Sequence, residues 1–388
     1  MDIKELDKAY VASTYARFPL TLTGGHGSVV TDDCGKEYID LGTGIAVNTF
    51  GSCDGEWVDA VCEQLHKIAH TSNLYYTEPC ARLAEQLCLR TGMKKVFFSN
   101  SGAEANECAI KTARRYAFRK YGDESHSTVI TLKNSFHGRT VTTLAATGQD
   151  TFHTEFGPFT EGFEYVGVGD LEGLEALAAK GAAAVMFEVV QGEGGVIALP
   201  EDFVHGMFDI AKKYGLLTIA DEVQCGNGRS GMLYAYMNYG VSPDIVTTAK
   251  GLCGGLPMGA TMFAESCADV LTPGSHGSTF GGNPVCAAGA LNVLSRIDDG
   301  LLEGVRRRSG MIRSYLTGKP GIKSVSGMGL MLGVETEKKA ADVIAYCREH
   351  GVLVLSAKAK VRLLPALNIP EELLEKALEV IADAAQNA

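Results

Sequence analysis

Residues 216–224 read LLTIADEVQ, and residues 244–251 read DIVTTAKG. Each stretch is a short apolar run that ends in a charged side chain, Asp221 in the first and Lys250 in the second. Such runs predict strands that are buried on both faces, as in a parallel sheet covered by helices. Ligands bind beyond the carboxyl ends of such strands. We therefore expect Asp221 and Lys250 to face one site at the edge of a sheet.

The same alternation of apolar runs and helix-length segments extends outward from these two stretches. It predicts further strands and helices, the strands at residues 96–99, 128–132 and 183–189 and the helices at residues 102–121 and 200–214. Alternating strands and helices indicate an α/β fold with a mostly parallel sheet.

The pattern changes after Asn283-Pro284. A long helical stretch follows, then strand pieces, and then an acidic amphipathic helix from Glu371. We expect a large domain covered by helices and a smaller α+β domain, divided as an N-terminal segment 1–45 that joins the small domain, a large domain 46–285 and a C-terminal small domain 286–388.

Composition narrows the class of protein further. The 388 residues carry a formal net charge of -11, and 46% of them are hydrophobic, which is typical of a globular protein. An acidic chain without basic clusters is a poor partner for nucleic acid or an anionic membrane. The first residues, MDIKELDKAY, lack the apolar core of a secretory signal. The 11 cysteines show no metal-ligand spacing, so we expect free thiols in the cytoplasm and no metal site.

A third strand end offers a site for an anion. The run VFFSN at residues 96–100 is followed by Ser101-Gly102-Ala103, where a helix is expected to begin. Backbone N–H groups and the helix dipole favour a phosphate at such a place, and glycine permits close approach. Without context, Ser101 fits an ordinary helix cap equally well.

Lys250 and Asp221 also have two interpretations each when taken alone. Lys250 follows an apolar strand, so it is either a lysine whose charged end reaches solvent or an amine whose pKa is lowered for Schiff-base chemistry. Asp221 is either a cap or a carboxylate that keeps a ring nitrogen protonated. Gln224, close to Asp221, could donate to an oxygen of the same ring.

Three more side chains fit an anionic or aromatic ligand. Phe136 and Arg139, in SFHGRT after the predicted strand 128–132, offer a flat face and a fork for a carboxylate. A core phenylalanine and a surface arginine are the alternatives. Arg362 lies inside an apolar strand, where an arginine usually has an anionic partner.

One motif is set aside. Residues 226–231, GNGRSG, match the glycine pattern of dinucleotide-binding proteins. That pattern requires its first glycine in the turn between a strand and a helix. Here Asp221 to Cys225 intervene and an aromatic segment follows, so we do not expect dinucleotide binding.

Taken together, these stretches resemble the class III aminotransferases of fold type I. The resemblance covers about residues 31–370 and rests on nine segments in order: IDLGTGIAVN (39–48), SNLYYTEP (72–79), FFSNSGAEAN (97–106), SFHGRT (135–140), VVQGEGGV (189–196), ADEVQCGNGRSG (220–231), TTAKGLCGGLPMGA (247–260), HGSTFGGNP (276–284) and VRLLPALNI (361–369). Within this family, the chain is most similar to the enzymes that act on N-acetylornithine.

The resemblance implies pyridoxal 5'-phosphate as the cofactor. Lys250 would form the Schiff base and shuttle the proton, and Asp221 would face the pyridine nitrogen. The remaining cofactor contacts would come from residues that match the family motifs, namely Ser101, Gly102, Ala103, Phe136, Val223, Gln224 and, across a dimer interface, Thr279.

The resemblance also implies a substrate site made of Arg139, Glu193, Ser278 and Arg362. The two arginines resemble the carboxylate-binding arginines of the family, and Glu193 resembles an acid that pairs with Arg362. The implied reaction moves the terminal amino group of N-acetylornithine to 2-oxoglutarate in a homodimer. Ornithine, succinylornithine and 4-aminobutyrate remain alternative donors, and a cofactor-binding protein without activity is the alternative class.

The chain departs from the family pattern at a few positions. Asp54-Gly55 stands where His-Pro is common, Cys225 where threonine is common, and Cys253 where glycine is common. Because Cys225 adjoins Gln224, its position leaves a reactive thiol open as a hypothesis.

Overall fold

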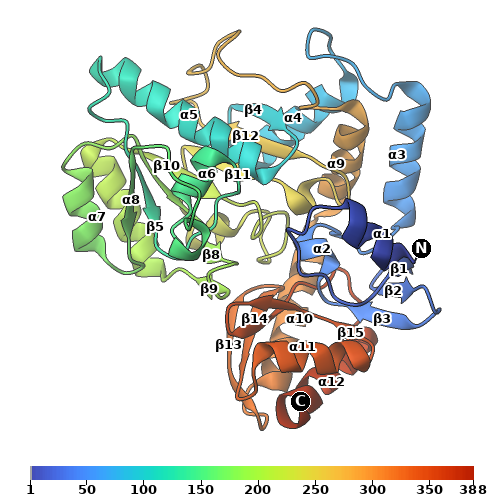
Figure 1. Cartoon of the computed structure of the whole chain (residues 1–388). Coiled ribbons are helices and arrows are strands. Elements are labelled where there is room, and N and C mark those ends of the chain that lie inside the picture. The colour runs from blue at the N-terminus through green and yellow to red at the C-terminus, as the bar shows by residue number, and fades with distance from the viewer. Residues whose placement is uncertain (1) are drawn as a thin grey trace.

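The computed structural model describes residues 2–388. Its largest sheet has seven strands in the order β4-β12-β11-β10-β7-β5-β6 (Figure 1). The strands are β4 (Lys95–Ser99), β5 (Val129–Leu132), β6 (Phe163–Val166), β7 (Ala184–Phe187), β10 (Leu217–Asp221), β11 (Ile245–Thr248) and β12 (Gly259–Phe263). Only β12 runs antiparallel to its neighbours among these pairings, so the prediction of a mostly parallel sheet is confirmed.

Both faces of this sheet are covered, as the apolar runs predicted. Along β7, Ala184 and Met186 belong to the core under α5 (Gly102–Tyr121), while Val185 and Phe187 belong to the core on the other face. The helices around the sheet include α3 (Gly55–Lys67), α4 (Glu78–Thr91), α6 (Val141–Ala146), α7 (Leu171–Ala178), α8 (Glu201–Tyr214) and α9 (Pro284–Arg296). Alternation of side chains across each strand explains this division.

A second sheet, of four strands, lies in the C-terminal part of the chain in the order β13-β14-β17-β16. Its elements, drawn in orange and red in Figure 1, are β13 (Ile322–Met328), β14 (Met331–Thr336), β16 (Leu355–Ala357), β17 (Lys360–Leu363), α10 (Asp299–Leu316), α11 (Ala340–Glu349) and α12 (Glu371–Asn387). The acidic helix α12 buries Leu374, Leu378 and Ile381 in a core separate from that of the large sheet.

The N-terminal segment is joined to this C-terminal part through a third sheet. It has the order β1-β2-β3-β15, with β1 (Leu22–His26), β2 (Val29–Asp32), β3 (Glu37–Asp40) and β15 (Val352–Leu353). The pairing of β15 with β3 supports our proposal that segment 1–45 joins the small domain. The proposed boundary between domains 46–285 and 286–388 cuts through α9, whose Ala287, Ala290 and Leu294 lie in the core of the large sheet. The first helix, α1 (Ile3–Tyr10), buries no side chain, and a short α2 (Thr43–Ala46) follows the sheet.

The remaining elements are short. They are the strand pair β8 (Val190–Gln191) and β9 (Ile197–Ala198) and the 3-10 turns at Asp150–Phe152, Ala235–Tyr239 and Lys250–Leu252. All eleven cysteines are free thiols, as expected. Over residues 2–388, no helix has the length and apolar character that crossing a bilayer requires.

Candidate active site

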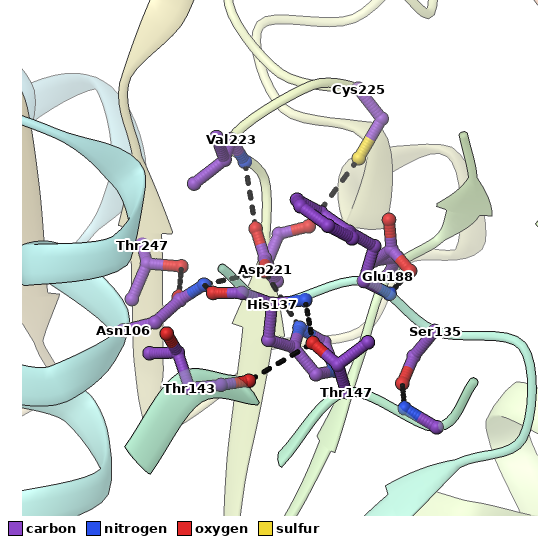
Figure 2. A network of polar contacts seen from close by, with 12 residues as sticks. Asn106, Ser135, His137, Thr143, Thr147, Glu188, Asp221, Val223, Cys225 and Thr247 are labelled. Atoms are coloured by element: carbon purple, nitrogen blue, oxygen red, sulfur yellow. Dashed lines mark hydrogen bonds and ion pairs between the residues drawn. The ribbon is translucent and has the colours of Figure 1, made fainter. Parts of the chain in front are cut away.

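A cavity of about 600 Å³ lies where the strands β10 and β11 end. It collects side chains that are far apart in the sequence, among them the predicted Ser101, Gly102, Ala103, Phe136, Arg139, Asp221, Val223, Gln224 and Lys250. The polar network at its base is shown in Figure 2. The expectation that Asp221 and Lys250 face one site at the sheet edge therefore agrees with the geometry.

The N-terminus of α5 forms one wall of the cavity. Ser101 caps the helix, because its Oγ accepts a hydrogen bond of 3.2 Å from the N–H of Glu104. The N–H groups of Gly102 and Ala103, in the first turn, have no partner within the helix. A Cβ atom at residue 102 would lie 2.6 Å from Val223 Cγ1, so glycine is required there. This wall can hold an anion such as a phosphate.

Asp221 ends β10 and is buried at the base of the cavity. Its Oδ2 accepts a 2.8 Å hydrogen bond from Asn106 Nδ2 and lies 2.7 Å from His137 Nδ1, while its Oδ1 accepts from the N–H of Val223 at 3.0 Å. Figure 2 shows these contacts, which come from α5, from the loop after β5 and from the loop after β10. The carboxylate is thereby held in one orientation.

Lys250 follows β11 and begins a 3-10 turn with a φ of 46°, a left-handed conformation that is rare outside glycine. Its Nζ makes no hydrogen bond or ion pair with the part of the chain that the structure describes. Burial lowers the pKa of this amine; the charge of Glu193 opposes that shift and the charge of Arg362 adds to it. The net pKa lies below the ordinary value of 10.5, which favours a nucleophilic amine.

Arg362, on β17, reaches the site from the C-terminal part of the chain. The side chain is buried, and its Nη1 lies 2.6 Å from Glu193 Oε1 and 3.1 Å from Gln224 Oε1. Burial raises the pKa of Glu193, but Arg362 and Lys250 outweigh it and hold this pKa below the ordinary value. Glu193 is therefore an ionised partner for Arg362, as the resemblance implied.

Arg139 is in a different state from Arg362. It is exposed at the cavity wall and makes no ion pair with any of residues 2–388. Its guanidinium lies 5.6 Å from the ring centre of Phe136 and 4.4 Å from that of Phe152. The cavity wall thus carries one arginine that is free to bind a carboxylate, and a second, already neutralised arginine lies behind the lining residue Gln224.

The sequence reasoning missed several residues of the cavity. Asn106 and His137, which hold Asp221, lie in the segments FFSNSGAEAN and SFHGRT, but no local pattern in the sequence shows that they reach Asp221. Glu188 accepts a 2.9 Å hydrogen bond from the N–H of Phe136; burial and the charge of Asp221 raise its pKa well above the ordinary value. An acid directly after the apolar run of β7 was a usable signal for it. Tyr15 also lines the cavity, and no sequence signal pointed to it.

Ser278 and Thr279 are not brought into this cavity within one chain. Ser278 Oγ accepts hydrogen bonds from Asn100 Nδ2 at 3.1 Å and from the N–H of Gly281 at 3.0 Å. Thr279 is exposed. The role implied for Thr279 belongs to the site of a partner subunit, so it stays a prediction.

Two features of the loop after β10 bear on the sequence interpretation. Cys225 is fully buried, and burial together with Glu222 raises the pKa of its thiol well above the ordinary value. The hypothesis of a reactive thiol is therefore wrong, because a buried neutral thiol is a weak nucleophile. The glycine motif at 226–231 is followed by the 3-10 turn Ala235–Tyr239 and does not open an α-helix. Its Arg229 is buried and donates to the carbonyls of Leu330 and Pro365 at 3.1 and 2.7 Å.

Fold and cavity together define a fold-type I enzyme that uses pyridoxal 5'-phosphate. The residues present fit this group, because the cavity joins an anion seat, a fixed carboxylate, an aromatic ring and an unpaired amine. The family model described as aminotransferase class III matches residues 10–385. The chain belongs to the class III aminotransferases.

Several relatives are close. The chain is 50% identical to an acetylornithine aminotransferase of Haemophilus ducreyi over 98% of this chain and 97% of the relative. It is 43% identical to one of Caldanaerobacter subterraneus over 97% of each. Among solved structures, the ornithine aminotransferase of Toxoplasma gondii has a TM-score of 0.94 at 32% identity, covering 98% of this chain and 94% of the other. The N-acetylornithine aminotransferase of Stenotrophomonas maltophilia has a TM-score of 0.85 at 34% identity, covering 98% and 97%.

Proposed function

We propose that the chain moves the terminal amino group of N-acetylornithine to 2-oxoglutarate, giving N-acetylglutamate 5-semialdehyde and glutamate in arginine biosynthesis. The observation that carries this proposal is the unequal state of the two arginines. Arg139 is free at the cavity wall, whereas Arg362 is paired with Glu193 at 2.6 Å. The relatives named as acetylornithine aminotransferases support the choice of donor.

The donor half of the reaction uses Arg139. A donor whose reacting amine is terminal has no carboxylate on the reacting carbon, so Arg362 must be neutralised by another anion. Glu193 supplies that anion from within the chain. The far carboxylate of the donor then pairs with Arg139, which places the terminal amine toward Lys250.

The acceptor half uses both arginines. 2-Oxoglutarate carries one carboxylate next to its carbonyl carbon and a second one at its far end. The first replaces Glu193 on Arg362, and the second binds Arg139. Exchange of one anion for another keeps the buried guanidinium paired, whereas an unpaired Arg362 would cost about 3–5 kcal/mol.

The residues that we propose to contact the cofactor lie around the same cavity. Lys250 would anchor the cofactor, Asp221 would face its ring nitrogen, Gln224 its phenolic oxygen, and Phe136 its ring face. Ser101, Gly102 and Ala103 would hold its phosphate, and Val223 packs beside Gly102. When bound, pyridoxal 5'-phosphate supplies an electron-withdrawing ring that stabilises charge at the substrate carbon. Lys250 Nζ holds and moves the proton at that carbon.

We further propose that the enzyme acts in the cytoplasm as a homodimer, with Thr279 and Ser278 serving the neighbouring site. Exposed apolar side chains support this, because Leu74, Tyr75, Tyr76 and Phe280 gather on two connections that hydrogen-bond to each other through Asn73. In Figure 1 the connections between α3 and α4 and before α9 project at one end of the molecule. Sedimentation should show a dimer or a multiple of it, and a fully active monomer would contradict the proposal.

The choice of donor is tested by comparing kcat/KM for N-acetylornithine, ornithine, N-succinylornithine and 4-aminobutyrate with 2-oxoglutarate as acceptor. We expect N-acetylornithine to be preferred, because the similar ornithine aminotransferases tend to place a tyrosine near the position of Gly44 to hold the free amino-acid end of ornithine, and this chain has Gly44-Ile45 there. Neither Gly44 nor Ile45 lines the cavity of the described chain, where the nearby Val47 does. A tenfold preference for another donor would make the substrate assignment wrong and leave the aminotransferase class intact.

A further inference from the structure

Asn106 is a buried polar residue one helical turn after Gly102 in α5. Its Nδ2 donates hydrogen bonds of 2.8 Å both to Asp221 Oδ2 and to the carbonyl of His137, and its Oδ1 accepts one of 2.7 Å from Thr247 Oγ1. Figure 2 shows Asn106 between Thr247 and Asp221. Both amide hydrogens and the amide oxygen are therefore used.

The orientation of this amide is determined by its neighbours. A carboxylate and a carbonyl only accept hydrogen bonds, so the NH2 group must face Asp221 and His137. The hydroxyl of Thr247 then donates to the amide oxygen. If the amide were rotated by 180°, its oxygen would meet two other acceptors in a buried site, which is unfavourable.

Asn106 also links the two ends of the proposed cofactor site. The first turn of α5 offers N–H groups to a phosphate, and the next turn, about 6 Å along the axis, holds Asp221 through Asn106. Because an α-helix is rigid over this length, the phosphate seat and the carboxylate are kept in a fixed relation. Asn106 and His137 both hold Oδ2 of Asp221, while Oδ1 has one donor, the N–H of Val223.

We propose that Asn106 is a positioning residue for amino transfer, which fixes the Asp221 carboxylate against the cofactor ring and is itself oriented by Thr247. This inference rests on the proposed function, because it assumes that Asp221 faces the ring nitrogen. The competing explanation is that Asn106 only joins α5 to the sheet. The two differ in one respect: a positioning residue acts through Asp221, and a packing residue does not.

A double-mutant cycle separates these explanations. The affinity of the apoenzyme for pyridoxal 5'-phosphate is measured by absorbance titration in the wild type, Asn106→Ala, Asp221→Asn and the double variant, with thermal unfolding as a check on folding. We expect Asn106→Ala to weaken binding about 10- to 100-fold, as for loss of a hydrogen bond to a charged group. In the Asp221→Asn background the same change should cost less than about threefold. Equal losses in both backgrounds would overturn the proposal.

Thr247 has a matched control, Thr131, on another strand of the same sheet. Thr247→Val removes the donor that orients Asn106, and we expect a smaller loss of affinity that disappears in the Asn106→Ala background. Thr131→Val is the control, since the buried Oγ1 of Thr131 has no hydrogen-bond partner within residues 2–388, and it should leave affinity unchanged. Equal effects of the two valine variants would contradict the role of Thr247.

The variant Asn106→Asp should make cofactor affinity depend on pH, an effect that a residue with only a packing role would not produce. It places a second carboxyl group against Asp221, and two adjacent carboxyl groups share a proton. Cofactor affinity should then fall as pH rises, whereas in Asn106→Ala it should follow the wild-type pH profile. A pH-independent Asn106→Asp variant with wild-type affinity would overturn the proposal. The affinity of the apoenzyme for the cofactor does not depend on which amino donor the enzyme uses. If N-acetylornithine is the wrong donor, this experiment therefore still tests the role of Asn106.

Discussion

At the level of single residues, the backbone decides which side chains become reactive. Lys250 is an ordinary lysine in composition, but it is held at a φ of 46° after a buried strand, with its amine among Glu193, Arg362, Asp221 and Glu188. Burial removes water from the charged form of an amine and so makes the neutral form more accessible. The strain at its backbone is located at the site where chemistry takes place.

The first prediction concerns this lysine. Lys250→Ala should abolish covalent attachment of the cofactor and lower kcat by at least about 100-fold, because the anchor and the proton carrier are lost together. Borohydride reduction followed by mass spectrometry measures the attachment. Lys212→Ala, an exposed change on α8, should keep both properties. A stable adduct in the Lys250→Ala protein would show that another residue is the anchor.

The second prediction concerns Glu193. Glu193→Gln removes the anion that neutralises Arg362 when a terminal amine reacts. The kcat/KM for the donor should fall about tenfold or more, while 2-oxoglutarate should bind at least as well, because it brings its own carboxylate. Steady-state kinetics with each substrate varied give both values. The exposed Glu172→Gln on α7 is the control, and equal losses for donor and acceptor would contradict the exchange of partners.

At the level of elements, α5 supplies much of the site because its first turns meet the ends of β10 and β11. Ser101 caps it, Gly102 lets it approach Val223, and Asn106 reaches Asp221. The helix ends at Tyr121, and Gly122 caps it in the left-handed conformation that is common after a last turn. Packing of small residues such as Ala109 and Ala113 against the sheet fixes its position.

The third prediction tests this helix. Gly102→Ala places a Cβ atom 2.6 Å from Val223 Cγ1, so α5 must shift or the valine must move. We expect weaker binding of pyridoxal 5'-phosphate by about tenfold or more and a stability loss of about 1–3 kcal/mol. Gly310→Ala in α10 is the matched control; no atom lies within 4 Å of its added Cβ, so it should be neutral or stabilising. Unchanged binding in Gly102→Ala would contradict the phosphate seat.

At the level of the whole molecule, buried acids make stability depend on pH. Burial raises the pKa of Glu222 to about 7, although the N–H groups of Ala235 and Tyr236 and the Cys225 thiol act against this shift. Because the folded pKa lies above the ordinary value of 4.5, the folded state holds a proton that the unfolded state has lost. The corresponding stabilisation is complete below pH 4.5 and is lost as pH rises to about 7.

The fourth prediction follows from this loss of stability with rising pH. Between pH 4.5 and about 7, Glu222 should lower the free energy of unfolding by up to about 3 kcal/mol as pH increases. Glu222→Gln cannot titrate, so its unfolding free energy should fall less over the same window. Chemical denaturation at several pH values measures the difference in slope. Parallel curves for the two proteins would show that Glu222 is already ionised in the fold.

The sequence by itself determined the large sheet, because its buried strands are continuous apolar runs that need no distant partner to be recognised. The predicted strand 244–248 appears as β11, Ile245–Thr248, and the predicted helix 102–121 appears as α5, Gly102–Tyr121. The charged ends of two strands located the cavity, since parallel strands end at one edge of the sheet. Motifs in order then indicated the aminotransferase family, which the comparisons confirmed.

Only the tertiary structure decided which side chains meet. Glu193 and Arg362 are 169 positions apart, and Asn106 and Asp221 are 115 apart, so no local pattern could join them. The tertiary structure also makes Cys225 inert and places Arg229 in hydrogen-bond contact with the C-terminal part of the chain. Neither could be predicted, because the burial of a residue depends on which segments pack over it. Local periodicity reports which face of an element is apolar, whereas hydrogen-bond partners and pKa shifts arise from contacts between distant segments.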